Sequence, residues 1–159
     1  MLLLAARGTH AGFEDGIEAY KRGEFEVAVA ELRTAAEAGH AEAPYVLGYI
    51  FANGGGVPVD YARAIKWFRV AAAHRDADAQ FNLGVLYAEG RGVPVDHDEA
   101  LRWFRLAAEQ SQEDAQYSLG LIFADGRGVD VDTTEAVRWF RLAAEKGQVD
   151  AQEIGRAHV

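Results

Sequence analysis

Apolar residues recur at three- and four-residue steps along most of the chain, which is the spacing of one face of a helix. In the segment "DAQFNLGVLYAE" these residues are Ala79, Leu83, Leu86 and Tyr87. After an intervening glycine-rich stretch, the same spacing is followed by Ala100, Leu101, Phe104, Ala107 and Ala108, with Trp103 beside them. The pattern predicts a first helix, a corner and a second helix.

This helix pair is repeated with a period of 36 residues and without gaps. The three copies begin "APYVLGYIFANGGGVPVD", "AQFNLGVLYAEGRGVPVD" and "AQYSLGLIFADGRGVDVD". Internal repetition of this length is typical of a solenoid, in which each unit buries its apolar face only against its neighbours. The sequence therefore predicts an all-α repeat protein.

A glycine interrupts the apolar face of each first helix, at Gly48, Gly84 and Gly120. Glycine inside a helix costs about 1 kcal/mol relative to alanine. Its return in every copy predicts that the partner helix approaches closely at this point.

The stretch between the two helices, "EGRGVPVDHDEA" at residues 89–100, contains glycines that resemble a phosphate-binding loop. Such a loop usually follows a strand and continues into Gly-Lys-Ser/Thr, neither of which is present here. We therefore interpret it as a corner. Gly90 and Gly92 supply positive φ, Val93 and Val95 pin the corner to the core, and Pro94 stiffens it.

An aspartate precedes each second helix as an N-cap, with a glutamate three residues later in two copies: Asp96 with Glu99, and Asp132 with Glu135. These pairs predict capping boxes. The first copy has Arg63 in the place of the glutamate, so we expect the cap of its second helix to be weaker.

The combination "LG", an aromatic residue, "G-x-G-V", aspartate and "A-x-x-W-F-x-x-A-A" resembles the Sel-1-like repeat family, relatives of the tetratricopeptide repeat, over residues 43 to 152. The resemblance implies an α/α superhelical solenoid of antiparallel helix pairs that binds partner proteins or peptides on its concave side without catalysis. Family members act as adaptors, mostly in bacteria. Departures from the pattern include Gly55 in place of Arg91 and Arg127, and Asp130 in place of Pro94.

Some disulfide-rich relatives in this family are linked to β-lactam binding or hydrolysis. The present chain has no cysteine, so this activity is not carried over. An envelope hydrolase or β-lactam-binding protein of the same repeat family is nevertheless the alternative to an interaction scaffold. A structural spacer within a larger protein is a further alternative.

The organisation along the chain is interpreted as four parts. Residues 1–12 are a truncated signal peptide or a disordered start, because "MLLLAA" is apolar but short and lacks a basic segment before it. Residues 13–40 are a degenerate tetratricopeptide-like capping pair in which Leu32 takes the place of Phe68 and the long corner is absent. Residues 41–152 contain three Sel-1-like repeats and the start of a fourth.

The fourth copy begins at Ala151 and Gln152 but then reads "EIGRAHV". We expect residues 153–159 to be a non-native tail, with Ile154–Val159 encoded by sequence outside the natural gene. A natural divergent tail is the alternative.

The formal charge is −9, from 16 basic and 25 acidic residues, which argues against nucleic acid and anionic membranes as partners. No stretch approaches the roughly 18 consecutive apolar residues of a membrane-spanning helix. The location depends on residues 1–12: periplasmic or secreted if they are a signal remnant, and otherwise cytoplasmic.

Catalytic and cofactor chemistry has little support in the sequence. The two serines, Ser111 and Ser118, have no evident histidine partner, and the five histidines lack metal-ligand spacing. We therefore predict no catalytic, cofactor or metal site and no cofactor.

Trp67, Trp103 and Trp139 are 36 residues apart and predict packing between repeats, so Trp103→Ala should cost about 3–5 kcal/mol.

The free side of the first helices is the predicted partner-binding surface. It comprises Tyr45, Tyr49, Asn53, Phe81, Val85, Glu89, Tyr117, Leu121 and Asp125. This surface would be apolar in the middle and acidic at one edge, with Glu42, Asp78 and Asp114 at the opposite end. It suits a protein or peptide with apolar anchors and some basic residues. The alternative is that these aromatic residues merely pack between adjacent first helices.

Overall fold

The computed structural model describes residues 2–145, with side chains from residue 12 onward. Within this range the chain forms eight α-helices and no strand, which confirms the all-α prediction. None of these helices is both long and apolar enough to span a membrane. The chain divides into two compact units, Met1–Ala79 and Gln80–Val159.

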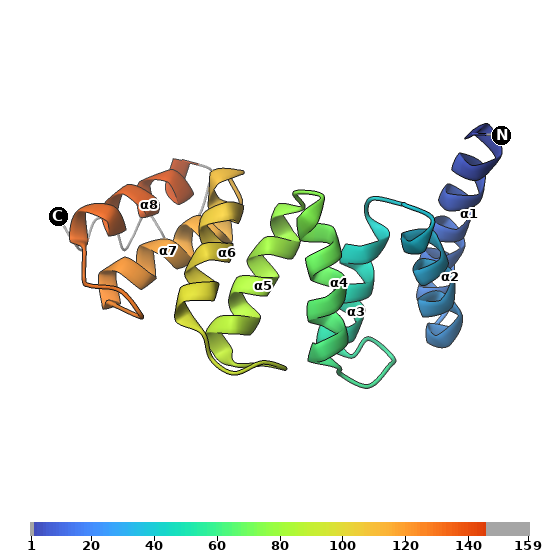
Figure 1. Cartoon of the computed structure of the whole chain (residues 1–159), viewed down its shortest axis with the longest axis horizontal. Coiled ribbons are helices and arrows are strands. Elements are labelled where there is room, and N and C mark those ends of the chain that lie inside the picture. The colour runs from blue at the N-terminus through green and yellow to red at the C-terminus, as the bar shows by residue number, and fades with distance from the viewer. Residues whose placement is uncertain (1, 146–159) are drawn as a thin grey trace. The chain divides into compact units, whose positions relative to one another are not determined.

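The first unit contains two helix pairs: α1 (Leu2–Lys21) with α2 (Phe25–Glu37), and α3 (Ala43–Asn53) with α4 (Tyr61–Ala73). In each pair the two helices pack together, and α2 also packs against α3 (Figure 1). The turn between α1 and α2 is short, and Gly23 lies in it at a φ of 78°.

The second unit contains all but the first three residues of α5 (Ala77–Glu89), followed by α6 (His97–Glu109), α7 (Glu113–Asp125) and α8 (Thr133–Glu145). In Figure 1, α7 lies beside α8, and α7 also packs against α6. Each repeat thus consists of a first helix, a corner and a second helix, as the periodicity predicted.

A glycine on each first helix receives an aromatic ring from the second helix of the same repeat. A Cβ atom on Gly48 would lie 2.5 Å from the ring of Phe68, and one on Gly84 would lie 2.6 Å from the ring of Phe104. Gly120 faces Phe140 in the same way. The predicted close approach is confirmed, and the core of every repeat is centred on this contact.

The α1–α2 pair has an equivalent contact that the sequence analysis missed. A Cβ atom on Gly16 would lie 2.7 Å from the side chain of Leu32. Leu32 is fully buried, as is Phe68 at the matching position. The pair therefore uses the same packing device as the repeats, with a leucine in place of the ring.

The corner after α5 has the predicted backbone, with φ of 67° at Gly90 and 76° at Gly92. Val93 is half-buried. Val95, however, is 55% exposed, so the prediction that it pins the corner to the core is wrong. Its methyl group instead covers the backbone at Gly90, where a Cβ atom would lie 2.7 Å from it.

The corner of the first repeat rests on the α1–α2 pair, which explains a departure from the repeat pattern. A Cβ atom on Gly55 would collide with the hydroxyl of Tyr20, and one on Gly56 would collide with the ring of Phe25. The sister repeats have Arg91 in the place of Gly55. A side chain at Gly55 would require Tyr20 to shift, because the Tyr20 hydroxyl occupies the space of a Cβ atom.

The N-caps of the second helices are formed as predicted, but the reciprocal half of the capping box is absent. The Asp96 carboxylate accepts the Glu99 N–H at 2.9 Å. The Asp96 N–H donates to the Tyr87 carbonyl at 3.0 Å, so it does not need the Glu99 side chain. Glu99 instead pairs with Arg102.

The expectation of a weaker cap in the first repeat is not supported by the geometry. The Asp60 carboxylate accepts the Arg63 N–H at 2.9 Å, the same distance as in the second repeat. The Arg63 guanidinium also returns to Asp60, with a separation of 3.1 Å. The arginine therefore supports the cap.

Helix α1 begins at Leu2 and so includes most of residues 1–12. The signal-remnant and disordered-start interpretations of that stretch stay predictions. The expected non-native tail, residues 153–159, lies outside the described residues.

Candidate functional site

In the first unit, α3 carries three of the predicted partner-binding residues. Tyr49 is the most open of them, at 49% exposure. Tyr45 is half-buried, with its ring centre 5.9 Å from that of Phe68. Asn53 is exposed, and its side-chain amide donates to the Tyr49 carbonyl at 3.0 Å. Tyr49 is therefore the most exposed aromatic side chain of α3.

In the second unit, Phe81 on α5 and Tyr117 on α7 are half-buried like Tyr45. The ring of Phe81 lies 5.8 Å from that of Phe104, and the ring of Tyr117 lies 5.7 Å from that of Phe140. Each ring packs on the second helix of its own repeat. These aromatic residues therefore extend the core contact of the repeat, and only part of each ring remains open.

A groove of about 260 Å³ in the second unit brings together three of the predicted residues from α5 and α7. Its apolar lining consists of Val85, Ala88, Ala100, Phe104, Leu121 and Ile122, and its polar lining of Glu89, His97, Ser118 and Arg127. We call it the α5–α7 groove. Its volume is below the roughly 300–1,000 Å³ of small-molecule sites, and suits one or two anchoring side chains.

The charges at the edge of this surface differ from the prediction. Glu89 pairs with Arg91 at 2.7 Å, and Asp125 pairs with Arg127 at 2.8 Å. The glycine between the two members of each pair has left-handed φ, which reverses the chain and sets the arginine beside the carboxylate. The expected acidic edge is therefore formally neutral at both positions.

The α5–α7 groove also contains His97 and Ser118, which the sequence analysis did not connect. They are 21 residues apart, on α6 and α7, and no motif links them. Within residues 12–145 neither side chain makes a hydrogen bond, so the serine has no base and the histidine has no acid to orient it. No signal in the sequence places them together, and only the packing of α6 against α7 does so.

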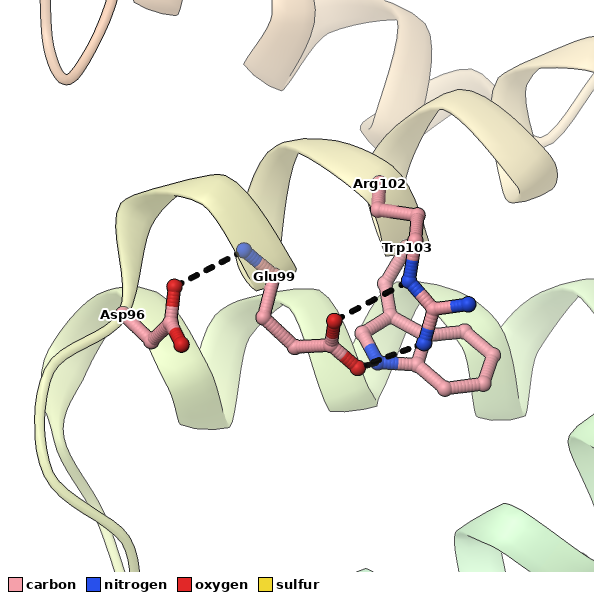
Figure 2. Close-up of polar contacts among 4 residues, drawn as sticks. All are labelled: Asp96, Glu99, Arg102 and Trp103. Atoms are coloured by element: carbon pink, nitrogen blue, oxygen red, sulfur yellow. Dashed lines mark hydrogen bonds and ion pairs between the residues drawn. The ribbon is translucent and has the colours of Figure 1, made fainter.

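The tryptophans are less uniformly buried than predicted. Trp139 is 9% exposed, whereas Trp67 and Trp103 are only half-buried. The Trp103 indole N–H donates to Glu99 at 2.9 Å, and the Arg102 guanidinium lies 4.7 Å from the ring centre (Figure 2). Trp103 is thus a partly open residue with a polar partner.

The same cluster shifts the acidity of two groups. Hydrogen bonding to Arg102 lowers the pKa of Glu99, with a smaller lowering from Trp103, against the opposing effect of burial. The same hydrogen bond raises the pKa of Arg102. Figure 2 shows that the carboxylate of Glu99 lies against the guanidinium. The ion pair therefore stays formed at neutral pH.

Metal-binding chemistry is not supported by the part of the chain that the structure describes. Residues 12–145 contain no group of three histidine, aspartate or glutamate side chains that could hold an ion. Glu42, Asp78 and Asp114, at the other end of the first helices, are exposed. They lie at or next to helix N-termini, where acids favour the helix dipole.

Comparison with known families agrees with the three copies of the helix pair. The family model described as "Sel1 repeat" matches residues 41–76, 77–112 and 113–148. The chain belongs to the Sel1 repeat family. Its members are typically protein-interaction scaffolds, they bind other proteins, and they are generally non-catalytic.

Two similar solved structures are Sel1 repeat proteins of bacteria. A protective antigen of uropathogenic Escherichia coli with an SLR fold is 42% identical, with a TM-score of 0.84, over 94% of this chain and 33% of the antigen. A Sel1 repeat protein from Oxalobacter formigenes is 36% identical, with a TM-score of 0.79, over 87% of this chain and 57% of its own. The chain thus spans about a third and just over half of these two relatives.

The cysteine-rich protein B of Helicobacter pylori shares the fold. It is 20% identical, with a TM-score of 0.64, over 79% of this chain and 96% of its own. No curated protein matches the sequence.

Proposed function

We propose that this Sel1 repeat chain is a non-catalytic interaction module that binds a partner protein or peptide on its first helices. The observation that carries the proposal is the α5–α7 groove, which has an apolar lining large enough for an anchoring side chain. The open ring of Tyr49 on α3 is the corresponding anchor point in the first unit. Apolar pockets with a polar rim are typical centres of binding energy at protein interfaces.

The proposed partner is a segment with apolar anchors and some basic residues, and it is neither nucleic acid nor a membrane. The apolar anchors follow from Val85 and Leu121 in the groove. The basic residues follow from the overall charge of −9, which steers basic partners toward the chain. Direct pairing at Glu89 and Asp125 would require a partner that displaces the arginines from them.

Selection of displayed random peptides on the immobilised protein tests this proposal. The variant to compare is Tyr49→Ala, Val85→Ala, Leu121→Ala, because it removes open apolar groups and leaves the core rings of Tyr45, Phe81 and Tyr117 in place. A matched control variant removes exposed apolar side chains elsewhere: Val27→Ala, Leu106→Ala and Val131→Ala. Circular dichroism establishes that both variants remain helical.

We expect an enriched motif with large apolar residues and a basic residue that the first variant loses and the control retains. Enrichment that the first variant retains would contradict binding at the first helices. A motif that both variants lose equally would point to nonspecific apolar adsorption.

A second candidate, a hydrolase or β-lactam-binding protein, has one observation in its favour, the presence of His97 and Ser118 in one groove. Its support is weaker because neither side chain is positioned by a hydrogen bond within residues 12–145. Hydrolysis of a chromogenic β-lactam by the wild type, abolished by Ser118→Ala, would favour this candidate. Equal background rates would leave the interaction module as the better proposal.

A further inference from the structure

One departure of the first repeat from its sisters concerns an acidic residue in the first turn of the second helix. In the second repeat, Glu99 pairs with Arg102 at 2.6 Å and accepts the indole N–H of Trp103. In the third repeat, Glu135 pairs with Arg138 at 3.2 Å. The first repeat has Arg63 at the position of Glu99, and Lys66 and Trp67 at the positions of Arg102 and Trp103. The acid that would pair with Lys66 and Trp67 is therefore missing.

One consequence is that Lys66 and Trp67 on α4 lack the acidic partner that Glu99 provides in the second repeat. Lys66 has no ion pair in the described part of the chain, and its ammonium lies 5.8 Å from the centre of the Trp67 ring. Trp67 is half-buried, and its indole N–H has no acceptor there. Between Tyr61 and Ala73, α4 carries three basic residues and no acidic one.

These groups border a groove between α2 and α4, with α3 beneath it. One part has a volume of about 260 Å³, with Leu47, Phe51 and Trp67 among the residues that line it. A larger part of about 420 Å³ shares Phe51 and continues along the corner over Val57 and Val59. We call the two parts together the α2–α4 groove. It lies wholly within the first unit.

The charged residues that line the smaller part of the α2–α4 groove are all cations: Arg33, Arg63 and Lys66. Arg33 on α2 is exposed and has no ion pair in the described residues. Arg63 is held by Asp60 and lies 5.3 Å from the centre of the Phe51 ring. The chain as a whole has a formal charge of −9, whereas the charged side chains that line this part of the groove are all positive and surround apolar residues.

We propose that the α2–α4 groove binds an acidic peptide segment of a partner protein, with an aliphatic or aromatic anchor seated between Phe51 and Trp67. Carboxylates beside the anchor meet Arg33 and Lys66, whose charges have no ion-pair partner within residues 12–145. Arginine and tryptophan are enriched among the residues that carry binding energy at interfaces. Ion pairs at such a rim add specificity and rate of association.

Nucleic acid fits this groove less well. Phosphate backbones are bound by extended basic surfaces, whereas here three cations border an apolar floor and the larger part adds the acids Glu26 and Asp60. The acidic peptide differs from the basic partner proposed for the first helices, and the cations that it meets, Arg33 and Lys66, lie on the second helices α2 and α4. The two proposals therefore stand or fall separately.

The decisive variant is Arg63→Glu, because it installs the residue that the second and third repeats have at this position. The new glutamate is expected to pair with Lys66 and to accept the Trp67 N–H, as Glu99 does with Arg102 and Trp103. An acid in the first helical turn also favours the helix dipole, so the variant should fold. Arg22→Glu is the matched control, since Arg22 is an exposed arginine of the same unit that is paired with an acid, Glu24.

The experiment is a selection of displayed random peptides on the wild type, followed by fluorescence anisotropy of the enriched synthetic peptides with each variant. We expect enrichment of aspartate or glutamate beside a large apolar residue, and affinity reduced about tenfold or more by Arg63→Glu, while Arg22→Glu changes it less than about twofold. Raised salt should weaken the same peptides. A labelled single-stranded oligonucleotide is titrated in parallel.

Three outcomes would overturn the proposal. One is the absence of any enriched acidic peptide on the wild type. Another is binding of such peptides that Arg63→Glu leaves unchanged, or that Arg22→Glu weakens equally. The third is binding of the oligonucleotide that Arg63→Glu abolishes while no peptide is enriched.

Discussion

Gly84 lies so close to the ring of Phe104 that a Cβ atom on the glycine would be 2.6 Å from the ring carbons. Both residues are buried, and the ring belongs to the second helix of the same repeat. At an ordinary exposed helical position, replacing glycine by alanine stabilises a helix by about 1 kcal/mol. The contact reverses that expectation because the methyl group has no space.

Gly84→Ala should therefore lower the free energy of unfolding by about 1–3 kcal/mol, the usual cost of overpacking a core. Urea denaturation followed by circular dichroism measures the change. Ala30→Gly makes the reverse substitution at an exposed position inside α2 and serves as the control. It should lower the free energy of unfolding by about 1 kcal/mol, because only helix propensity changes there. If Gly84→Ala proved neutral or stabilising, the close approach of the two helices would be refuted.

The repeat period made this contact predictable, whereas Gly16 shows where the period fails. Gly48, Gly84 and Gly120 are 36 residues apart, so their common role is visible in the alignment. Gly16 precedes Gly48 by only 32 residues, because the turn between α1 and α2 is shorter than the corners of the repeats. The shorter turn moves the first helix out of register, and only the packed structure shows that Gly16 meets Leu32.

The polar contacts show a second limit of sequence reasoning. The spacing of Asp96 and Glu99 predicts that each caps the other, and half of this is correct. The side chain of Glu99 had three available donors: the Asp96 N–H, Arg102 and Trp103. Because the Asp96 N–H is bound by the Tyr87 carbonyl of the preceding helix, the glutamate pairs with the other two. That choice depends on a tertiary contact that local spacing does not contain.

The candidate site was predictable as a helix face but not as a set of contacts. Val85, Glu89 and Leu121 were assigned to one surface by helical geometry, and they line one groove. His97 and Ser118 reach the same groove from α6 and α7, which the repeat alignment alone does not reveal. The pairing of Glu89 with Arg91 depends on the left-handed glycine between them.

The tryptophans should differ in their contribution to stability. Trp139 is 9% exposed, so Trp139→Ala should cost about 3–5 kcal/mol, as expected for a large buried aromatic residue. Trp103 is half-buried, so Trp103→Ala should cost less, about 1–3 kcal/mol. Urea unfolding of both variants provides the comparison. An equal or larger loss for Trp103→Ala would contradict the difference in burial.

Stability should depend on the charge of Glu99 at acidic pH. Its pKa is lowered in the folded chain, so its stabilising contribution is fully present above the ordinary glutamate pKa of about 4.3 and is lost as the pH falls through the folded value. Glu99→Gln removes this charge. We expect it to cost about 0.5–1 kcal/mol at neutral pH, because Arg102 is largely exposed and its ion pair is screened by water.

Urea unfolding of the wild type and Glu99→Gln at about pH 7 and about pH 3 measures this contribution. The difference between the two proteins should shrink at the lower pH, because the wild-type carboxyl loses its charge as the pH falls through its lowered pKa in the folded chain. Glu109→Gln, at an exposed position on the same helix, is the control and should show no such convergence. A difference that stays constant across this range would mean that the ionised Glu99 does not contribute through its charge.

The N-caps of the first and second repeats should be equally important, although their sequences differ at the third helical position. Asp60 and Asp96 each accept the backbone N–H of the third helical residue at 2.9 Å. The Arg63 side chain also pairs with Asp60, whereas the Glu99 side chain pairs with Arg102 and not with Asp96. Asp60→Ala and Asp96→Ala should therefore each cost about 1 kcal/mol, within the usual range for loss of a cap.

Asp60→Asn retains the cap acceptor and loses only the charge, so it should cost less than Asp60→Ala. Urea unfolding of the three variants separates the two contributions. A much smaller cost for Asp60→Ala than for Asp96→Ala would restore the interpretation that Arg63 weakens its cap.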